Sequence, residues 1–150
     1  LPYPISEKQL RLGLKNIQSL TRFIGRWQIL GSNPTIICDS AHNEAGIELS
    51  MSQLLHTPHE ALHIVMGVVK DKDLSKMLPY FPEEATYYFA KADIPRGLDT
   101  KILKEKARDY GLLGENYASV VEALEAAKSS AKKEDLIYVG GSIFVVAEVI

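Results

Sequence analysis

Short apolar runs alternate with segments of helical periodicity along most of the chain, and this alternation constrains the fold more than any other feature. The candidate strands are 27–30, 35–38, 62–67, 85–92 and 136–139, with a very short one near 116–117. Apolar residues recur at helical spacing over 43–55, 99–110 and 119–132, and a shorter helix is expected at 72–81. Strands that alternate with helices predict βαβ units with right-handed crossovers. We therefore expect an α/β fold with a doubly wound, mainly parallel, Rossmann-like sheet and helices on both faces.

The chain divides near Gly25. Residues 6–20 predict an amphipathic helix that Ser6 caps, so that 1–24 is interpreted as a lead-in helix and hinge. Residues 25–150 are enough for one domain with its own core. Within it, we expect Val120, Val121 and the other apolar residues of 119–132 to face the core. Because the first residue is not Met, we expect this chain to be a fragment or a processed product.

Charge and cysteine content exclude several classes of protein. A net charge of -2 offers no basic surface for nucleic acid or for a membrane. No apolar run reaches the roughly 18 residues of a membrane span. The single Cys38 allows no internal disulfide and fits a reducing, cytoplasmic location; we expect it to be buried. His56, His59 and His63 share no ligand spacing, so no metal site is expected in this chain.

Four loops with polar side chains follow the candidate strands, at 39–43, 68–73, 93–97 and 140–142. In an open α/β sheet, ligands bind beyond the carboxyl ends of the strands, where such loops meet. These loops hold carboxylates, a histidine, lysines, an arginine and a hydroxyl, and most lead into a helix N-terminus, which favours anions. An anionic ligand is therefore expected at this edge. We expect nothing comparable at the opposite edge.

Each of these residues also has a simpler interpretation. Asp39 could only cap the next helix, His42 could only pack in its loop, and Lys72 could belong to a solvated charge run. Arg26 could pair with any acidic neighbour, and short Gly-Gly-Ser turns such as the one ending at Ser142 are common. The chain has no phosphate-binding loop of the Gly-x-x-x-x-Gly-Lys-[Ser/Thr] type and no credible catalytic nucleophile set.

Taken in order, the motifs resemble the C-terminal domain of the Mur-ligase superfamily, and within it the folylpolyglutamate synthase/dihydrofolate synthase branch. The matching segments are Gly25-Arg26, Asp39-Ser40-Ala41-His42-Asn43, Gly67-Val68-Val69-Lys70-Asp71-Lys72-Asp73, Pro95-Arg96 and Gly140-Gly141-Ser142-Ile143-Phe144-Val145-Val146-Ala147-Glu148-Val149. Three positions depart from the branch's pattern: Ser40 replaces a glycine, Glu44 a proline and Gly140 a threonine.

The resemblance implies an ATP-dependent amide ligase that adds L-glutamate to folate or dihydropteroate through an acyl phosphate. By that resemblance, Arg26 and Asp39 contact ATP, whereas His42, Lys72, Ser142 and Arg96 hold glutamate. Lys72 and His42 are also the catalytic candidates. The phosphate loop and the Mg²⁺ ligands are expected in the preceding N-terminal domain, so this chain alone is expected to be inactive. Two alternatives stay open, namely another Mur-type ligase of cell-wall synthesis and a non-catalytic anion-binding α/β module.

Overall fold

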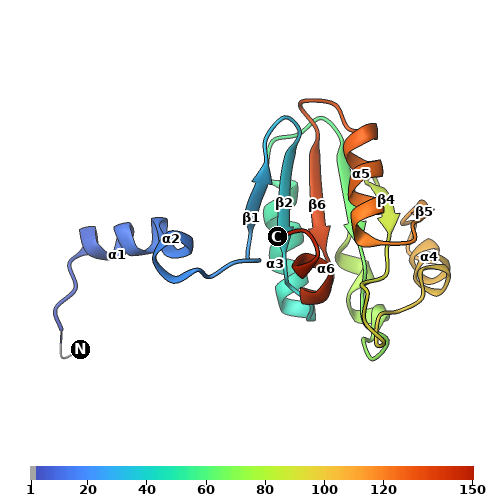
Figure 1. Cartoon of the computed structure of the whole chain (residues 1–150), viewed down its shortest axis with the longest axis horizontal. Coiled ribbons are helices and arrows are strands. Elements are labelled where there is room, and N and C mark those ends of the chain that lie inside the picture. Colours follow the sequence, from blue (N-terminus) through green and yellow to red (C-terminus); the bar gives the residue numbers. More distant parts are fainter. Residues whose placement is uncertain (1–2) are drawn as a thin grey trace.

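The computed structural model describes residues 3–150 and begins with a helical arm that lies apart from the sheet (Figure 1). The arm contains α1 (Glu7–Lys15) and α2 (Ile17–Thr21), which break at Asn16, where one continuous helix was expected. As predicted, Ser6 caps α1, in a reciprocal capping box with Gln9. The apolar side chains of the arm, such as that of Leu14, are exposed.

Six strands form one sheet in the order β1-β2-β6-β3-β4-β5. The strands are β1 (Gln28–Gly31), β2 (Thr35–Asp39), β3 (Leu62–Met66), β4 (Thr86–Phe89), β5 (Gly114–Asn116) and β6 (Leu136–Gly140). All neighbouring pairs are parallel except β1 with β2, so the predicted, mainly parallel sheet is confirmed.

Helices cover both faces of the sheet, as expected (Figure 1). The longer ones are α3 (Glu44–Leu55), α4 (Thr100–Arg108) and α5 (Val120–Ser130), and a short α6 (Ile143–Ala147) follows β6. One core contains residues of α3 and α4, including Met51 and Leu103, against Tyr87 and Tyr138. The other contains residues of α5 and α6, including Leu124 and Val145. Burying each such aliphatic side chain contributes about 1.5–3 kcal/mol, which is why these faces hold the layers together.

No helix within residues 3–150 has both the length and the apolar character needed to cross a bilayer.

The position of β6 determines which loops lie side by side at the carboxyl edge of the sheet. After β5, the chain returns through α5 and inserts β6 between β2 and β3. In the register, Gly140 pairs with Asp39 on one side and with Met66 on the other. The loops that follow β2, β6 and β3 therefore start level with one another, although β6 is the last strand of the chain.

Two local expectations were wrong. In place of one helix over 72–81, the chain forms two short 3₁₀ turns, η1 (Leu74–Lys76) and η2 (Leu78–Tyr80). Pro79 lies at the start of η2, and because it lacks an N–H and its ring obstructs the preceding turn, an α-helix cannot run through it. Val121 is exposed, whereas Val120 is buried, because consecutive helical residues point about 100° apart and only one of the two can face the core.

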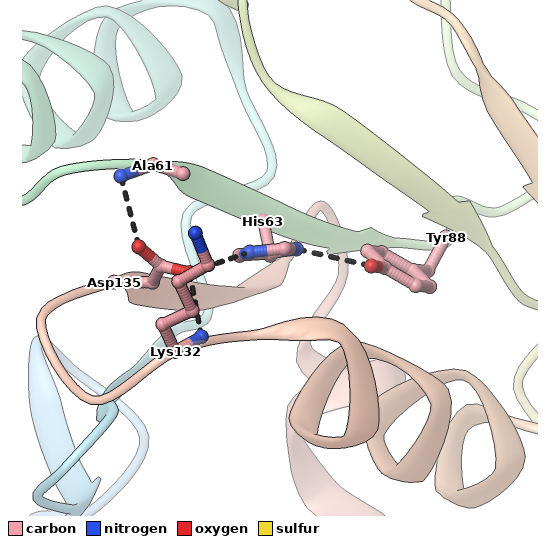
Figure 2. Close-up of polar contacts among 5 residues, drawn as sticks. All are labelled: Ala61, His63, Tyr88, Lys132 and Asp135. Atoms are coloured by element: carbon pink, nitrogen blue, oxygen red, sulfur yellow. Dashed lines mark hydrogen bonds and ion pairs between the residues drawn. The ribbon is translucent and has the colours of Figure 1, made fainter.

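The amino edge of the sheet holds a buried polar cluster, contrary to the expectation that this edge carries nothing comparable (Figure 2). The Nδ1 atom of His63 lies 3.0 Å from the Tyr88 hydroxyl, and its Nε2 atom lies 3.4 Å from the Asp135 carboxylate. Asp135 also accepts hydrogen bonds from the backbone N–H groups of Lys132 (2.7 Å) and Ala61 (3.1 Å).

This cluster joins the start of β3 to the loop between α5 and β6. The Lys132 N–H holds the pKa of the Asp135 carboxyl below its ordinary value, against the opposing effect of burial, and His63 and Ala61 add to the lowering. His63 and Asp135 lie 72 positions apart in the sequence, so no local pattern could reveal the pair.

Cys38 is buried, as expected, and burial together with the nearby Asp39 carboxylate raises the pKa of its thiol to about 11. At pH 8 we expect the folded chain to react with a maleimide or iodoacetamide on the order of 100-fold more slowly than the denatured chain, because the thiolate is the reactive form. Alkylation followed by mass spectrometry, with and without denaturant, measures both rates. Equal rates would contradict the buried, protonated thiol.

Candidate functional site

A cavity of about 190 Å³ opens at the carboxyl edge of the sheet, where the loops that follow four strands meet. Its lining residues are His42, Val69, Lys72, Arg96, Ser142, Ile143 and Phe144. The structure thus brings together all four residues that the resemblance assigned to glutamate, from the loops after β2, β3, β4 and β6. The loops after β3 and β4 are joined by backbone bonds from Lys70 N–H to the Arg96 carbonyl and from Leu98 N–H to the Val68 carbonyl, both 2.9 Å.

His42 is half-buried, and one hydrogen bond determines its tautomer. Its Nδ1 atom lies 2.9 Å from the backbone carbonyl of Ser40. A carbonyl oxygen only accepts, so Nδ1 carries the hydrogen, and in the neutral ring Nε2 keeps a free lone pair. The next residue, Asn43, caps α3 through the Gly46 N–H at 2.8 Å, which anchors the loop. His42 is therefore an oriented acceptor when neutral and a donor when charged.

Ser142 is buried and combines a structural contact with a free donor. Its hydroxyl oxygen accepts from the Phe144 N–H at 3.2 Å and so begins α6. Within residues 3–150 its own hydrogen has no acceptor. The preceding Gly141 has a φ of 91°, and a Cβ atom there would lie 2.7 Å from the Gly67 carbonyl oxygen. Only glycine allows this turn to bring Ser142 against the end of β3.

The two cations of the cavity differ in their surroundings. Arg96 forms an ion pair with Asp71, with one guanidinium nitrogen 2.8 and 3.0 Å from the two carboxylate oxygens. This pairing holds the pKa of the Asp71 carboxyl below its ordinary value. The Arg96 guanidinium also lies 5.9 Å from the centre of the Phe144 ring. Lys72 is half-buried, and its ammonium makes no ion pair within residues 3–150. Of the two cations, Lys72 is therefore the one that no carboxylate of the described residues holds at ion-pair distance.

Arg26 and Asp39, which the resemblance assigned to ATP, lie outside this cavity. Arg26 is exposed and lines a separate hollow between the helical arm and β1, with no ion pair among the described residues. Asp39 is buried at the end of β2. Its carboxylate accepts hydrogen bonds from Trp27 N–H (2.7 Å), Ala41 N–H (2.8 Å) and the Ser50 hydroxyl (3.1 Å). A contact of either residue with ATP stays a prediction.

Gly140, which stands where the resembling pattern has threonine, is explained by its neighbour. A Cβ atom at Gly140 would lie 2.6 Å from the ring and the hydroxyl of Tyr138. The two residues point to the same face of β6, and the bulky ring occupies the space of any side chain at the later position. The Tyr138 side chain therefore accounts for the absence of a threonine, and of its hydroxyl, at position 140.

The sequence did not single out Phe144, Val69 or Asp71 as site residues. Phe144 and Val69 form the apolar part of the cavity wall, and Asp71 holds Arg96. All three stand inside the matching motifs, and this was the only sequence signal for them. The larger hollow of about 510 Å³ between α4 and β5 contains none of the motif residues.

Together, the cavity residues supply a free ammonium, a guanidinium, a hydroxyl donor and an oriented imidazole. This set suits a small molecule with carboxylates and an amine. Within residues 3–150, no three His, Cys, Asp or Glu side chains are grouped to hold a metal ion.

Comparison with known proteins agrees with this chemistry. At 34% identity over 145 residues, the chain resembles a probable bifunctional folylpolyglutamate synthase/dihydropteroate synthase of Haloferax volcanii, covering 96% of this chain and 17% of that protein. It is 31% identical over 147 residues to the dihydrofolate synthase/folylpolyglutamate synthase of Escherichia coli K12, covering 97% of this chain and 33% of that protein. The chain thus spans a third or less of the length of these relatives.

Solved structures give the same result. The crystal structure of a bifunctional folylpolyglutamate synthase/dihydrofolate synthase from Yersinia pestis CO92 matches with a TM-score of 0.80 at 26% identity, over 98% of this chain and 34% of that one. A bifunctional folylpolyglutamate synthase/dihydrofolate synthase with Mn, AMPPNP and L-glutamate bound matches equally, with a TM-score of 0.80 at 26% identity, over 98% of this chain and 34% of that one. The model of the Mur ligase, glutamate ligase domain, matches residues 25–143, and the chain therefore belongs to this family.

Proposed function

We propose that this chain is the glutamate-binding domain of an ATP-dependent ligase that adds L-glutamate to folate or dihydropteroate. The observation that carries the proposal is the meeting of His42, Lys72, Arg96 and Ser142 at one cavity of about 190 Å³. The relatives are folate-glutamate ligases by name, and one solved relative holds L-glutamate with AMPPNP and Mn.

In this proposal each cavity group has one task. Lys72 and Arg96 bind the two carboxylates of glutamate, and the Ser142 hydroxyl donates a further hydrogen bond. The Nε2 lone pair of neutral His42 accepts a hydrogen bond from the substrate's amine and directs its nitrogen at the acyl phosphate. The amide bond forms as the neutral amine attacks the acyl carbon, the bond from that carbon to the phosphate oxygen breaks, and the proton that the nitrogen loses passes to Nε2 of His42. Because the amine is held in place, a bimolecular step becomes a positioned one, which is worth about 7–11 kcal/mol in favourable cases.

The rest of the reaction needs a second domain. Residues 1–24 are proposed as the lead-in from an N-terminal domain with the phosphate loop and the Mg²⁺ ligands, and 25–150 as the closing domain. The family match from residue 25 and the exposed apolar face of the arm support this division. Closure of the two domains would keep water from the acyl phosphate. A cytoplasmic location stays a prediction.

The full-length protein tests the function directly. We expect ADP formation to require both L-glutamate and a folate or dihydropteroate acceptor, and the product to contain one added glutamate by mass spectrometry. Turnover with a cell-wall nucleotide precursor in place of the folate would contradict the proposal and support the other ligase class.

Arg26→Ala in the full-length protein is expected to lower kcat/KM for ATP about 10- to 100-fold, because a charge-assisted contact to phosphate is lost. Arg26 is exposed, so the melting temperature of the chain should stay unchanged. Steady-state kinetics and a thermal melt measure the two effects. Arg108→Ala, an exposed arginine on α4, is the control and should leave the ATP kinetics unchanged. Wild-type kinetics for Arg26→Ala would exclude the contact.

A further inference from the structure

A second hollow, of about 350 Å³, lies between the loop that follows β3 and the helix α4. It is called the α4 groove below, and its lining includes side chains of both segments together with Leu98. Lys72 lines both the α4 groove and the cavity of about 190 Å³, so the two hollows adjoin at this side chain. The proposed function gives the α4 groove no task.

Three lysines give the α4 groove a positive rim. Lys70, Lys72 and Lys106 all line it, and none of them forms an ion pair within residues 3–150. The Lys70 ammonium donates one hydrogen bond, to the Pro95 carbonyl at 2.9 Å, which orients the group and leaves its charge and its other hydrogens in place. The rim therefore presents three ammonium groups to an anionic ligand.

Two carboxylates also line the α4 groove and offset this charge in part. Asp73 accepts hydrogen bonds from the backbone N–H and the hydroxyl of Ser75, at 3.1 and 2.6 Å, and lies 3.9 Å from the Lys76 ammonium. The Ser75 hydroxyl, above all, holds the pKa of the Asp73 carboxyl below its ordinary value. Asp109 lies at the C-terminal end of α4. The lining keeps an excess of positive charge, because three lysines stand against two aspartates.

The rest of the α4 groove is largely apolar. Leu74 is buried, Leu98 and Tyr110 are half-buried, and Ile102 is 47% exposed. The loops after β3 and β4 are joined by the backbone bonds described above, so this wall is formed before any ligand binds. Apolar side chains beneath a basic rim suit a ligand that has methylene groups on one side and carboxylates on the other.

We propose that the α4 groove binds the glutamyl residues that a folate acceptor already carries, next to the cavity that receives the incoming glutamate. This inference rests on the proposed function: a ligase that adds glutamate to a folate makes a product that ends in glutamate and is itself a possible acceptor. Each glutamyl residue of such a chain has a free carboxylate and a short methylene chain, whichever of its carboxyls forms the linkage. It therefore matches the lysines and the apolar wall together.

The position of Lys72 connects the two sites. The acyl carbon has to reach the amine that the cavity holds, so the chain that carries this carbon must pass the edge of the cavity. The α4 groove adjoins that edge at Lys72. With about 350 Å³ against about 190 Å³ for the cavity, it has room for more than one glutamyl residue if the cavity holds one glutamate.

Binding to the 150-residue chain tests the α4 groove without any turnover. The probes are p-aminobenzoyl-glutamate and p-aminobenzoyl-triglutamate, measured by isothermal titration and by amide shifts in NMR spectra. We expect the triglutamate to bind about 5-fold or more tightly than the monoglutamate, because its additional carboxylates meet the lysines. The triglutamate should shift the amides of Leu98, Ile102 and Tyr110. Lys106→Met should remove most of the difference between the probes, and Lys106 is exposed, so the core stays intact.

Lys101→Met is the matched control. It removes an exposed lysine of the same helix, which lines the separate hollow between α4 and β5, and it should leave both affinities unchanged. Equal losses in Lys101→Met and Lys106→Met would show attraction to the overall charge only. Equal affinities of the two probes for the wild type would show that the groove does not bind the glutamyl chain. Either result would overturn the proposal.

Kinetics of the full-length protein complete the test. Lys106→Met is expected to raise the KM for a folate triglutamate about 3- to 10-fold, while the KM values for the monoglutamate and for L-glutamate stay within about 2-fold. An equal rise for both folates, or a rise for L-glutamate, would refute the groove. Absent turnover in the wild type, with binding still dependent on chain length, would contradict the proposed function alone. Normal turnover without any dependence on chain length would contradict the α4 groove alone.

Discussion

Lys72→Met in the full-length protein is expected to raise the KM for L-glutamate about 10- to 100-fold while the KM for ATP changes little. Lys72 is half-buried at the cavity, and its ammonium makes no ion pair within residues 3–150, so it is available to bind a substrate carboxylate. Methionine keeps most of the side chain's length and apolar contact but removes the charge. Initial rates at varied glutamate and at varied ATP measure the two constants.

The control for this variant lies in the same segment. Lys76→Met removes an exposed lysine, 3.9 Å from the Asp73 carboxylate, that does not line the cavity. It should leave both constants unchanged, because surface ion pairs contribute little. A fall in kcat for Lys72→Met with an unchanged KM for glutamate would indicate that Lys72 contacts the transferred phosphate and does not bind glutamate. Parallel losses for both substrates, together with a lower melting temperature, would indicate a structural role.

Asp135→Ala is expected to lower the free energy of unfolding by about 3–5 kcal/mol, the largest effect on stability that we predict. The carboxylate satisfies the backbone N–H groups of Lys132 and Ala61 and lies next to the buried His63 (Figure 2). Its loss leaves these two part-buried donors without their acceptor and removes the partner of the buried His63. Urea denaturation of the 150-residue chain, followed by circular dichroism, measures the difference.

Two variants bracket this effect. Tyr88→Phe removes only the hydroxyl at the far end of the cluster and should cost about 1 kcal/mol. Glu134→Ala changes the exposed neighbour of Asp135 and should stay within about 0.5 kcal/mol of the wild type. If Asp135→Ala were no more destabilising than Glu134→Ala, the cluster would not contribute to stability.

The difference in the free energy of unfolding between the wild type and Asp135→Ala is expected to depend on pH. The pKa of Asp135 is lower in the folded chain than its ordinary value. The contribution of Asp135 to the free energy of unfolding is therefore complete above its pKa in the unfolded chain, about 3.9. It disappears as the pH falls through the lower pKa that Asp135 has in the folded chain. The stability gap between the wild type and Asp135→Ala should narrow only in this acidic range.

Much of the fold could be predicted because its strands and helices follow from patterns among residues that are close together in the sequence. A both-sides-buried strand appears as a continuous apolar run, and 62–67 and 136–139 correspond closely to β3 and β6. The starts of the helices could also be predicted from nearby residues. The side chains of Asn43, Asp99 and Ser119 accept hydrogen bonds from backbone N–H groups at the starts of α3, α4 and α5, respectively. That the polar loops share one edge followed from the parallel alternation alone.

What the sequence by itself determined, then, is the set of elements, the faces that they bury and the edge at which the polar loops emerge. Only the tertiary structure decided that β6 lies between β2 and β3, which brings Ser142 beside His42 and Lys72 and joins His63 to Asp135. It also decided that Asp39 is buried while Lys72 makes no ion pair with any of the residues 3–150. The physical reason is that periodicity depends on neighbours a few residues apart, whereas strand order and the partner of each charge depend on contacts between segments far apart in the chain.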